Sequence, residues 1–136
     1  MKISSATLRW ATCLAPIGLL AACAQAPVVK PPEPIGLMDI TERPAERALL
    51  SGLRAYDDGQ YLEAERQLND ALKVGLVSAK DRAAAQKHLA FVYCTSRREA
   101  LCEGAFKAAR AAYPAFALSR SEAGHPVWGP VYKRLN

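Results

Sequence analysis

The side chains able to do covalent or metal chemistry are four cysteines and two histidines, namely Cys13, Cys23, Cys94, Cys102, His88 and His125. A thiol can carry a lipid, join a second thiol, ligate a metal or act as a redox nucleophile. The spacings include no C-x2–4-C or H-x3–5-H pair of the kind found in zinc sites. We therefore expect no metal site and no cofactor, with His88 on a helix surface and His125 orienting the final segment.

No arrangement typical of an enzyme accompanies these residues. We find no nucleophile with a partner base, no paired carboxylates on an apolar background and no glycine-rich phosphate loop. Asp57 and Asp58 precede Gly59, where two carboxylates ordinarily form a solvated helix end. The sequence thus predicts a binding or scaffold protein and not an enzyme.

The first 22 residues indicate export. Lys2 and Arg9 are followed by 13 uncharged residues, which suits a signal sequence (about 7–15 residues) and is too short for a membrane span of about 20. The ending Leu20-Ala21-Ala22-Cys23 resembles the lipobox of bacterial lipoproteins. This resemblance implies that residues 1–22 are a removed signal peptide and that the Cys23 thiol carries lipid, with acyl chains such as palmitate. An ordinary cleaved signal is the alternative.

The lipid also predicts the location of the protein. Each buried CH₂ of an acyl chain contributes about 0.8 kcal/mol, so several chains anchor firmly. In lipoproteins the residue after the cysteine influences sorting, and here it is Ala24 rather than the Asp associated with inner-membrane retention. We expect an outer-membrane lipid anchor that faces the periplasm.

Residues 23–41 are expected to form a proline-rich tether. Pro27, Pro31, Pro32 and Pro34 lie within eight residues, a density that excludes a helix interior or a central strand. At about 3.1 Å per extended residue the tether reaches up to roughly 60 Å. It would hold the folded part clear of the lipid headgroups, although a tail of no particular length fits equally well.

Residues 42–136 suffice for one small domain. They are rich in alanine and lack alternating β-branched runs, which favours an all-α fold. The formal net charge of the chain is +5, and removal of Lys2 and Arg9 leaves 16 basic and 13 acidic residues. Because these charges are interspersed, we expect no nucleic-acid partner.

Helical periodicity predicts a first pair of helices. One is expected over residues 45–58, after an N-cap at Thr41. The other is expected over residues 61–74, ending at Gly75, which suits a C-cap.

A second pair of helices is predicted further along the chain. Ser78 is expected to cap a helix that runs to about Cys94. Thr95 or Ser96 is expected to cap the next helix, which stops before Pro114.

The two pairs repeat each other. The first reads Gly52-x3-Tyr56-x2-Gly59-x-Tyr61-x2-Ala64-x3-Leu68-x2-Ala71-Leu72, and the second has Leu89, Ala90, Tyr93, Cys102, Phe106, Ala109 and Pro114. These patterns resemble the tetratricopeptide repeat, with a period of 38 residues. We expect small residues where the helices approach closely (Gly52, Ala64, Ala90, Ala109) and large ones filling the gaps (Tyr61, Leu68, Tyr93, Phe106). A four-helix bundle with coincidental spacing is the alternative.

The C-terminal segment is expected to cover the second hairpin, because two repeats need a cover at the end. Ser119 and Glu122 have capping-box spacing. A short capping helix follows, with Pro126 or Pro130 at its first position. Its apolar residues are Trp128, Val131, Tyr132 and Leu135.

Cys94 and Cys102 remain once Cys13 is removed and Cys23 is lipidated. In an oxidising compartment this pair predicts a disulfide. The short loop would contribute about 2.5 kcal/mol in the chain-entropy description. A thiol redox site is the alternative, although the spacing is not C-x-x-C.

A protein-binding groove is expected on the inner face of the first helix of each hairpin. If the helices stack as in tetratricopeptide proteins, this face presents Leu49, Leu53, Tyr56, Lys87 and Phe91. Such a surface takes an extended or helical segment of a partner. The alternative is that several of these residues belong to the core.

The lipobox, the tether, the hairpins, the cysteine pair and the tail Glu122-Ala123-Gly124-His125-Pro126-x-Trp128-Gly129-Pro130-Val131-Tyr132 together resemble the TssQ family of lipoproteins associated with type VI secretion. The resemblance covers nearly the whole chain. It implies an accessory, non-enzymatic protein of the secretion apparatus, which we expect to be an adaptor for an envelope or secretion protein, with no small-molecule substrate. The alternative is a structural lipoprotein of general envelope or cell-wall assembly, unrelated to secretion.

Overall fold

A computed structural model describes residues 43–135 of the chain. Six helices and no strand lie within that range, which confirms the all-α prediction: α2 (Pro44–Asp57), α3 (Tyr61–Val74), α4 (Ala79–Thr95), α5 (Glu99–Ala112), α6 (Arg120–Ala123) and α7 (Gly129–Arg134). The predicted signal peptide, the Cys23 anchor, the tether and the Thr41 cap lie outside the described residues.

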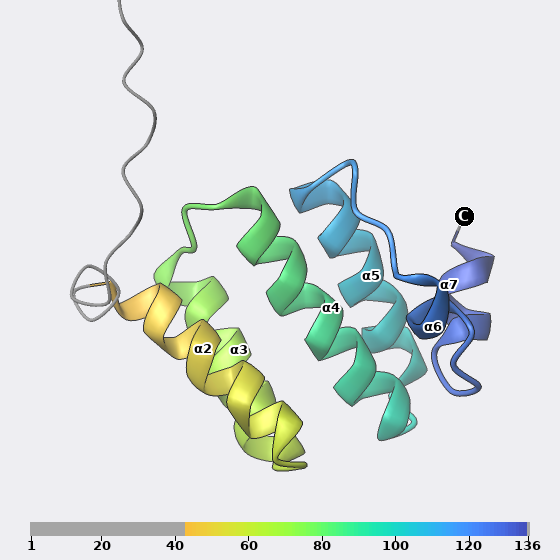
Figure 1. Cartoon of the computed structure of the whole chain (residues 1–136), viewed down its shortest axis with the longest axis horizontal. Coiled ribbons are helices and arrows are strands. Elements are labelled where there is room, and N and C mark those ends of the chain that lie inside the picture. Colours follow the sequence, from red (N-terminus) through yellow and green to blue (C-terminus); the bar gives the residue numbers. More distant parts are fainter. Residues whose placement is uncertain (1–42, 136) are drawn as a thin grey trace, which may run out of the picture. The chain divides into compact units, whose positions relative to one another are not determined.

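The first four of these helices form two hairpins. α2 packs chiefly against α3, and α4 against α5. The hairpins lie side by side, and α6 and α7 lie beyond α5 (Figure 1). Two helical hairpins with short C-terminal helices are therefore the observed architecture, as predicted.

The 38-residue repeat is confirmed in the backbone hydrogen bonds of the two turns. The N–H of Gln60 donates to the carbonyl of Ala55 at 2.8 Å, and the N–H of Arg98 donates to the carbonyl of Tyr93 at the same distance. Both bonds span five residues, as in the C-terminal cap of a helix. The two hairpins thus turn in the same way, one repeat apart.

Each turn contains one residue in the left-handed backbone region. It is Gly59 in the first turn (φ +73°) and Arg97 in the second (φ +60°). Glycine adopts this region freely, whereas a residue with a Cβ pays roughly 1–2 kcal/mol in steric strain. The second turn therefore holds a strained residue where the first does not.

The hairpins pack through small residues, as expected. A Cβ added at Gly52 would lie 2.8 Å from the Cγ atom of Leu68, so α2 and α3 touch directly at this point. Ala64, Ala90 and Ala109 are fully buried. Of the large residues, Leu68, Tyr93 and Phe106 are buried, but the prediction for Tyr61 is wrong: its side chain is 45% exposed at the start of α3.

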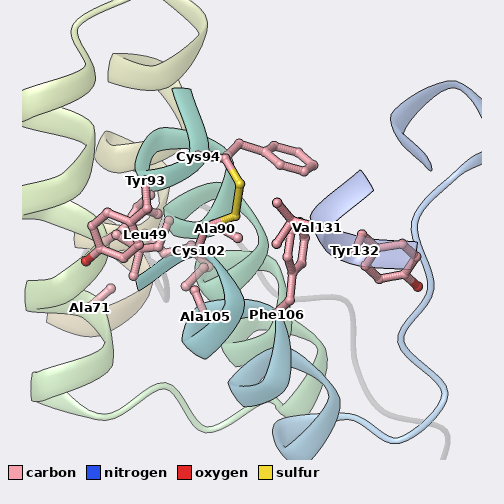
Figure 2. Close-up of a cluster of buried hydrophobic side chains, with 14 of the residues drawn as sticks. Leu49, Ala71, Ala90, Tyr93, Cys94, Cys102, Ala105, Phe106, Val131 and Tyr132 are labelled. Carbon is pink, nitrogen blue, oxygen red and sulfur yellow. A yellow bond between two sulfur atoms is a disulfide. The ribbon is translucent and has the colours of Figure 1, made fainter. Parts of the chain in front are cut away.

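One hydrophobic core runs through both hairpins and reaches α7. Figure 2 shows Phe106 of α5 with Val131 and Tyr132 of α7 on one side, and Leu49 and Ala71 of the first hairpin on the other. The rings of Phe106 and Tyr132 lie 5.2 Å apart, edge to face. The C-terminal segment therefore covers the second hairpin, as predicted.

The predicted helix boundaries hold at four places and fail at one. Gly75 follows α3, Ser78 accepts a hydrogen bond from the N–H of Asp81 at 3.2 Å, α5 ends before Pro114, and Ser119 and Glu122 form a capping box. Thr95 and Ser96 do not cap α5. Their hydroxyls donate back to the carbonyls of Phe91 and Val92, at 2.6 and 2.7 Å, so they close α4 instead.

The N-cap of α5 is Arg98, which links the two hairpins. Its guanidinium donates two hydrogen bonds to the carboxylate of Glu65 in α3, at 2.9 and 2.6 Å. The same group lies 4.7 Å from the ring centre of Tyr93. Such a two-point contact fixes orientation as well as distance.

Candidate functional site

The five predicted groove residues do lie on α2 and α4, but they differ in exposure. Leu53, Tyr56 and Lys87 are partly exposed, while Leu49 and Phe91 are only 6% and 3% exposed. Leu49 belongs to the core shared by the hairpins, and the ring of Trp128 stacks on Phe91 with 4.3 Å between ring centres. The prediction that Leu49 and Phe91 present freely accessible side chains is therefore corrected: they support the groove from beneath.

A hollow of about 270 Å³ lies between the first turns of α2 and α4. We call it the α2–α4 hollow, and its lining residues are Arg43, Glu46, Leu49, Leu50, Leu53, Asp81 and Ala84. Leu50 is 40% exposed there. Leu50 and Ala84 were missed from the sequence, although Leu50 follows Leu49 in the apolar stripe of α2.

The hollow carries unpaired carboxylates. Glu46 and Asp81 are half-buried, and neither makes an ion pair within residues 43–135. Arg43 lines the same hollow at the start of α2. The hollow therefore combines an apolar floor with a mixed rim in which the acidic groups outnumber the basic one.

The other end of the predicted groove is covered by the C-terminal segment. The ammonium of Lys87 donates to the carboxylate of Glu122 at 2.7 Å, and both side chains are about one quarter exposed. The indole N–H of Trp128 donates to the backbone carbonyl of Glu122 at 2.9 Å, which fixes the ring over Phe91. Lys87 and Phe91 thus contact a segment of their own chain.

His88 is not on the helix surface, contrary to expectation. Its ring lies 5.2 Å from that of Tyr56 and 5.8 Å from that of Phe91, both edge to face. Its Nδ1 atom is 2.8 Å from the carbonyl of Ala84. The single turn that separates Ala84 from His88 lies on the side of α4 facing the end of α2, which turns the ring inward.

Burial and nearby charge alter three ionisable groups here. Burial lowers the pKa of His88, against an opposing hydrogen bond with Ala84. Burial also raises the pKa of Tyr56, with contributions from Tyr61, Asp57 and Glu122. Burial alone would raise the pKa of Glu122, but hydrogen bonds from Lys87 and Ser119 outweigh it and lower the pKa.

A second hollow, of about 260 Å³, adjoins the first at Ala84. It lies between α4 and the segment that joins α5 to α6, and its lining includes Lys80, Lys87, Tyr113 and Phe116. Lys80 lies 5.9 Å from the ring centre of Tyr113. The rim of this second hollow is basic, whereas that of the α2–α4 hollow is mainly acidic.

The cysteine pair lies at the far end of α4. The sulfur atoms of Cys94 and Cys102 are 2.06 Å apart in a disulfide, and the Cα atoms are 5.2 Å apart (Figure 2). Cys102 is fully buried and Cys94 is 8% exposed. The bond closes the loop that holds Arg97, so its position suits a structural role.

Two further tests bear on chemistry and location. Among residues 43–135, no three His, Cys, Asp or Glu side chains gather where they could hold a metal ion. No helix in the same range combines the length and the apolar character of a membrane span.

Comparison of the chain with models of protein families, with curated proteins and with solved structures finds no match. The resemblances to the tetratricopeptide repeat and to the TssQ family therefore remain predictions from the sequence.

Proposed function

We propose that the protein is an outer-membrane-anchored, periplasmic lipoprotein that acts as a protein-binding adaptor, an accessory component of a type VI secretion system. The observation that carries the binding role is the α2–α4 hollow. It exposes leucine side chains between two hairpins that are otherwise well packed, and a partner segment can bury them.

The location and the secretion system rest on the sequence. The lipobox at Cys23 supports lipid anchoring, and the resemblance of the cysteine pair and tail to TssQ supports the secretion role. A binding role needs no chemical reaction, and the polar groups of the covered end are engaged with one another, as the Lys87–Glu122 pair shows.

A photocrosslinking experiment in cells tests this proposal. A photoreactive amino acid replaces Leu50 in the full, lipid-anchored chain, in a strain that carries the type VI secretion genes. The matched control places the same group at Leu62, which is 85% exposed on α3 and away from the hollow. Mass spectrometry then identifies each crosslinked protein.

We expect Leu50, but not Leu62, to crosslink to a component of the secretion apparatus, and Cys23→Ala to lose that product. An envelope protein captured equally in a strain without secretion genes would instead support the general envelope role. Crosslinks from both positions alike, or from neither, would remove the adaptor proposal.

A further inference from the structure

The acidic residues of the folded region fall into two groups. Six of the ten within residues 43–135 are in ion pairs, namely Glu63, Glu65, Asp70, Glu99, Glu103 and Glu122. Glu46, Asp57, Asp58 and Asp81 have no such pair in that range. Two of these four, Glu46 and Asp81, line the α2–α4 hollow.

The hollow is an exception on a basic molecule. Residues 43–135 contain 15 Lys and Arg against 10 Asp and Glu side chains. Long-range attraction would therefore bring acidic partners to most of the surface, and a basic segment would be favoured only close to the hollow. A local charge of opposite sign fixes the position and register of a partner more than it adds to affinity.

The floor of the hollow sets the other requirement. Leu49, Leu50 and Leu53 follow one another along the α2 side, and Ala84 lines the α4 side. At about 270 Å³ the hollow is too small for a folded element, but it has room for aliphatic side chains. Anchors at positions i and i+3 or i+4 of an amphipathic helix reach into a groove in this way.

We propose that the α2–α4 hollow takes a basic amphipathic helix of the partner protein. Two aliphatic side chains one turn apart bury themselves on Leu50, Leu53 and Ala84, and a Lys or Arg next to them lies between Glu46 and Asp81. Arg43, at the rim, favours a partner whose positive charge lies on the Asp81 side. The inference rests on the proposed function, since it describes the partner of the same surface.

Two model peptides test the charge of the partner. Both are 16-residue helices with the same leucine face, and one carries lysine on its polar face where the other carries glutamate. Fluorescence anisotropy measures their binding to the full lipidated chain in nanodiscs of zwitterionic lipid, with empty nanodiscs subtracted. We expect the lysine peptide to bind at least tenfold more tightly at low salt, and the difference to shrink as salt screens the charges.

Substitutions then assign the effect to the hollow. Glu46→Gln with Asp81→Asn should weaken binding of the lysine peptide about three- to tenfold, as expected for two partly exposed charge pairs. Asp58→Asn is the matched control, because Asp58 is also unpaired but lies at the exposed end of α2. Leu50→Asp should abolish binding of both peptides, and circular dichroism checks that each variant is folded.

The outcomes separate this inference from the proposed function. Equal binding of the two peptides, or an unchanged affinity after the double substitution, would overturn the basic partner while leaving the crosslinks at Leu50 to decide the adaptor role. Binding of neither peptide together with a dimer in sedimentation would also overturn it, because a second copy would then fill the hollow.

Discussion

The two hairpins have the same backbone geometry but reach it by different chemistry. Gly59 and Arg97 occupy equivalent left-handed positions, 38 residues apart. The first turn relies on the freedom of glycine, whereas the second holds an arginine inside a loop closed by Cys94 and Cys102. Because a disulfide of this loop length contributes about 2.5 kcal/mol, it outweighs the roughly 1–2 kcal/mol cost of the strained residue.

The hairpins also differ in what covers them. The second is covered by α6 and α7, with Trp128 on Phe91 and Glu122 on Lys87. The first leaves Leu50 and Leu53 partly exposed above the hollow. The comparison teaches that one repeat unit can serve stability in one copy and recognition in the other, with few changes of sequence.

Truncation of the two equivalent core residues, Leu68 and Phe106, should have the largest effect. Both are fully buried, and their replacement by alanine should cost about 2–5 and about 3–5 kcal/mol of unfolding free energy, respectively. Because Phe106 also contacts Tyr132, only Phe106→Ala should loosen α7. Urea unfolding measures the first effect and hydrogen exchange of the α7 amides the second.

Leu62→Ala provides the control for this pair, because an exposed leucine should change stability by less than about 0.5 kcal/mol. Equal exchange of α7 in the Leu68 and Phe106 variants would show that the two hairpins share the C-terminal cover.

Removal of the disulfide should have the next largest effect. Cys94→Ala with Cys102→Ala should lower the free energy of unfolding by about 2.5 kcal/mol, since the unfolded chain regains the freedom of the closed loop. Urea unfolding of the variant and of the reduced natural chain should agree. An unchanged stability would mean that the second turn, like the first, holds its shape without the bond.

The left-handed residues should give a smaller and opposite pair of effects. A Cβ at Gly59 meets nothing within 4 Å, so Gly59→Ala should cost only the backbone strain, about 1–2 kcal/mol. Arg97→Gly should relieve that strain, less the greater freedom of glycine in the unfolded chain, for a net gain below about 1 kcal/mol. Thermal unfolding measures both, and a loss of stability in Arg97→Gly would contradict the interpretation.

The smallest effect is a dependence on pH that only the second hairpin carries. Burial lowers the pKa of His88 below its ordinary value of 6.5, so the unfolded chain binds more protons in acid. The free energy of unfolding should therefore be full above about pH 6.5 and fall as the pH drops below it. Urea unfolding between pH 5 and 7.5 should show this slope, and His88→Gln should remove it.

His125→Gln is the matched control, because it leaves His88 in place. The lowered pKa of Glu122 acts in the same direction but lower on the scale, below its ordinary 4.5, so the chosen range isolates His88. A slope that survives in His88→Gln would assign the dependence to another group.

Much of the fold was predictable because it is encoded locally. Gly75, Ser78 and the Ser119–Glu122 box act within one turn of the chain, so their residue types suffice to place helix ends. The 38-residue spacing of Gly52 and Ala90 predicts the repeat for the same reason. Thr95 and Ser96 were misassigned because a hydroxyl near a helix end can serve the helix behind it as well as the one ahead.

The site was less predictable because it depends on distant partners. The contacts of Glu65 with Arg98 and of Lys87 with Glu122 join residues more than 30 positions apart. Periodicity places Lys87 and Phe91 on the correct face of their helix, but it cannot tell that Trp128 and Glu122 cover them. The hollow itself appears only when α2 and α4 are placed together.

The position of α6 and α7 limits how the molecule can assemble. They lie against the second hairpin, on the side where a further repeat would add, and Arg134 pairs there with Glu99 and Glu103. An array of hairpins that ends in this way cannot lengthen by stacking another chain onto that end. Any multivalent engagement must then come from the density of anchored copies in the membrane, and avidity becomes a matter of how many molecules the cell places side by side.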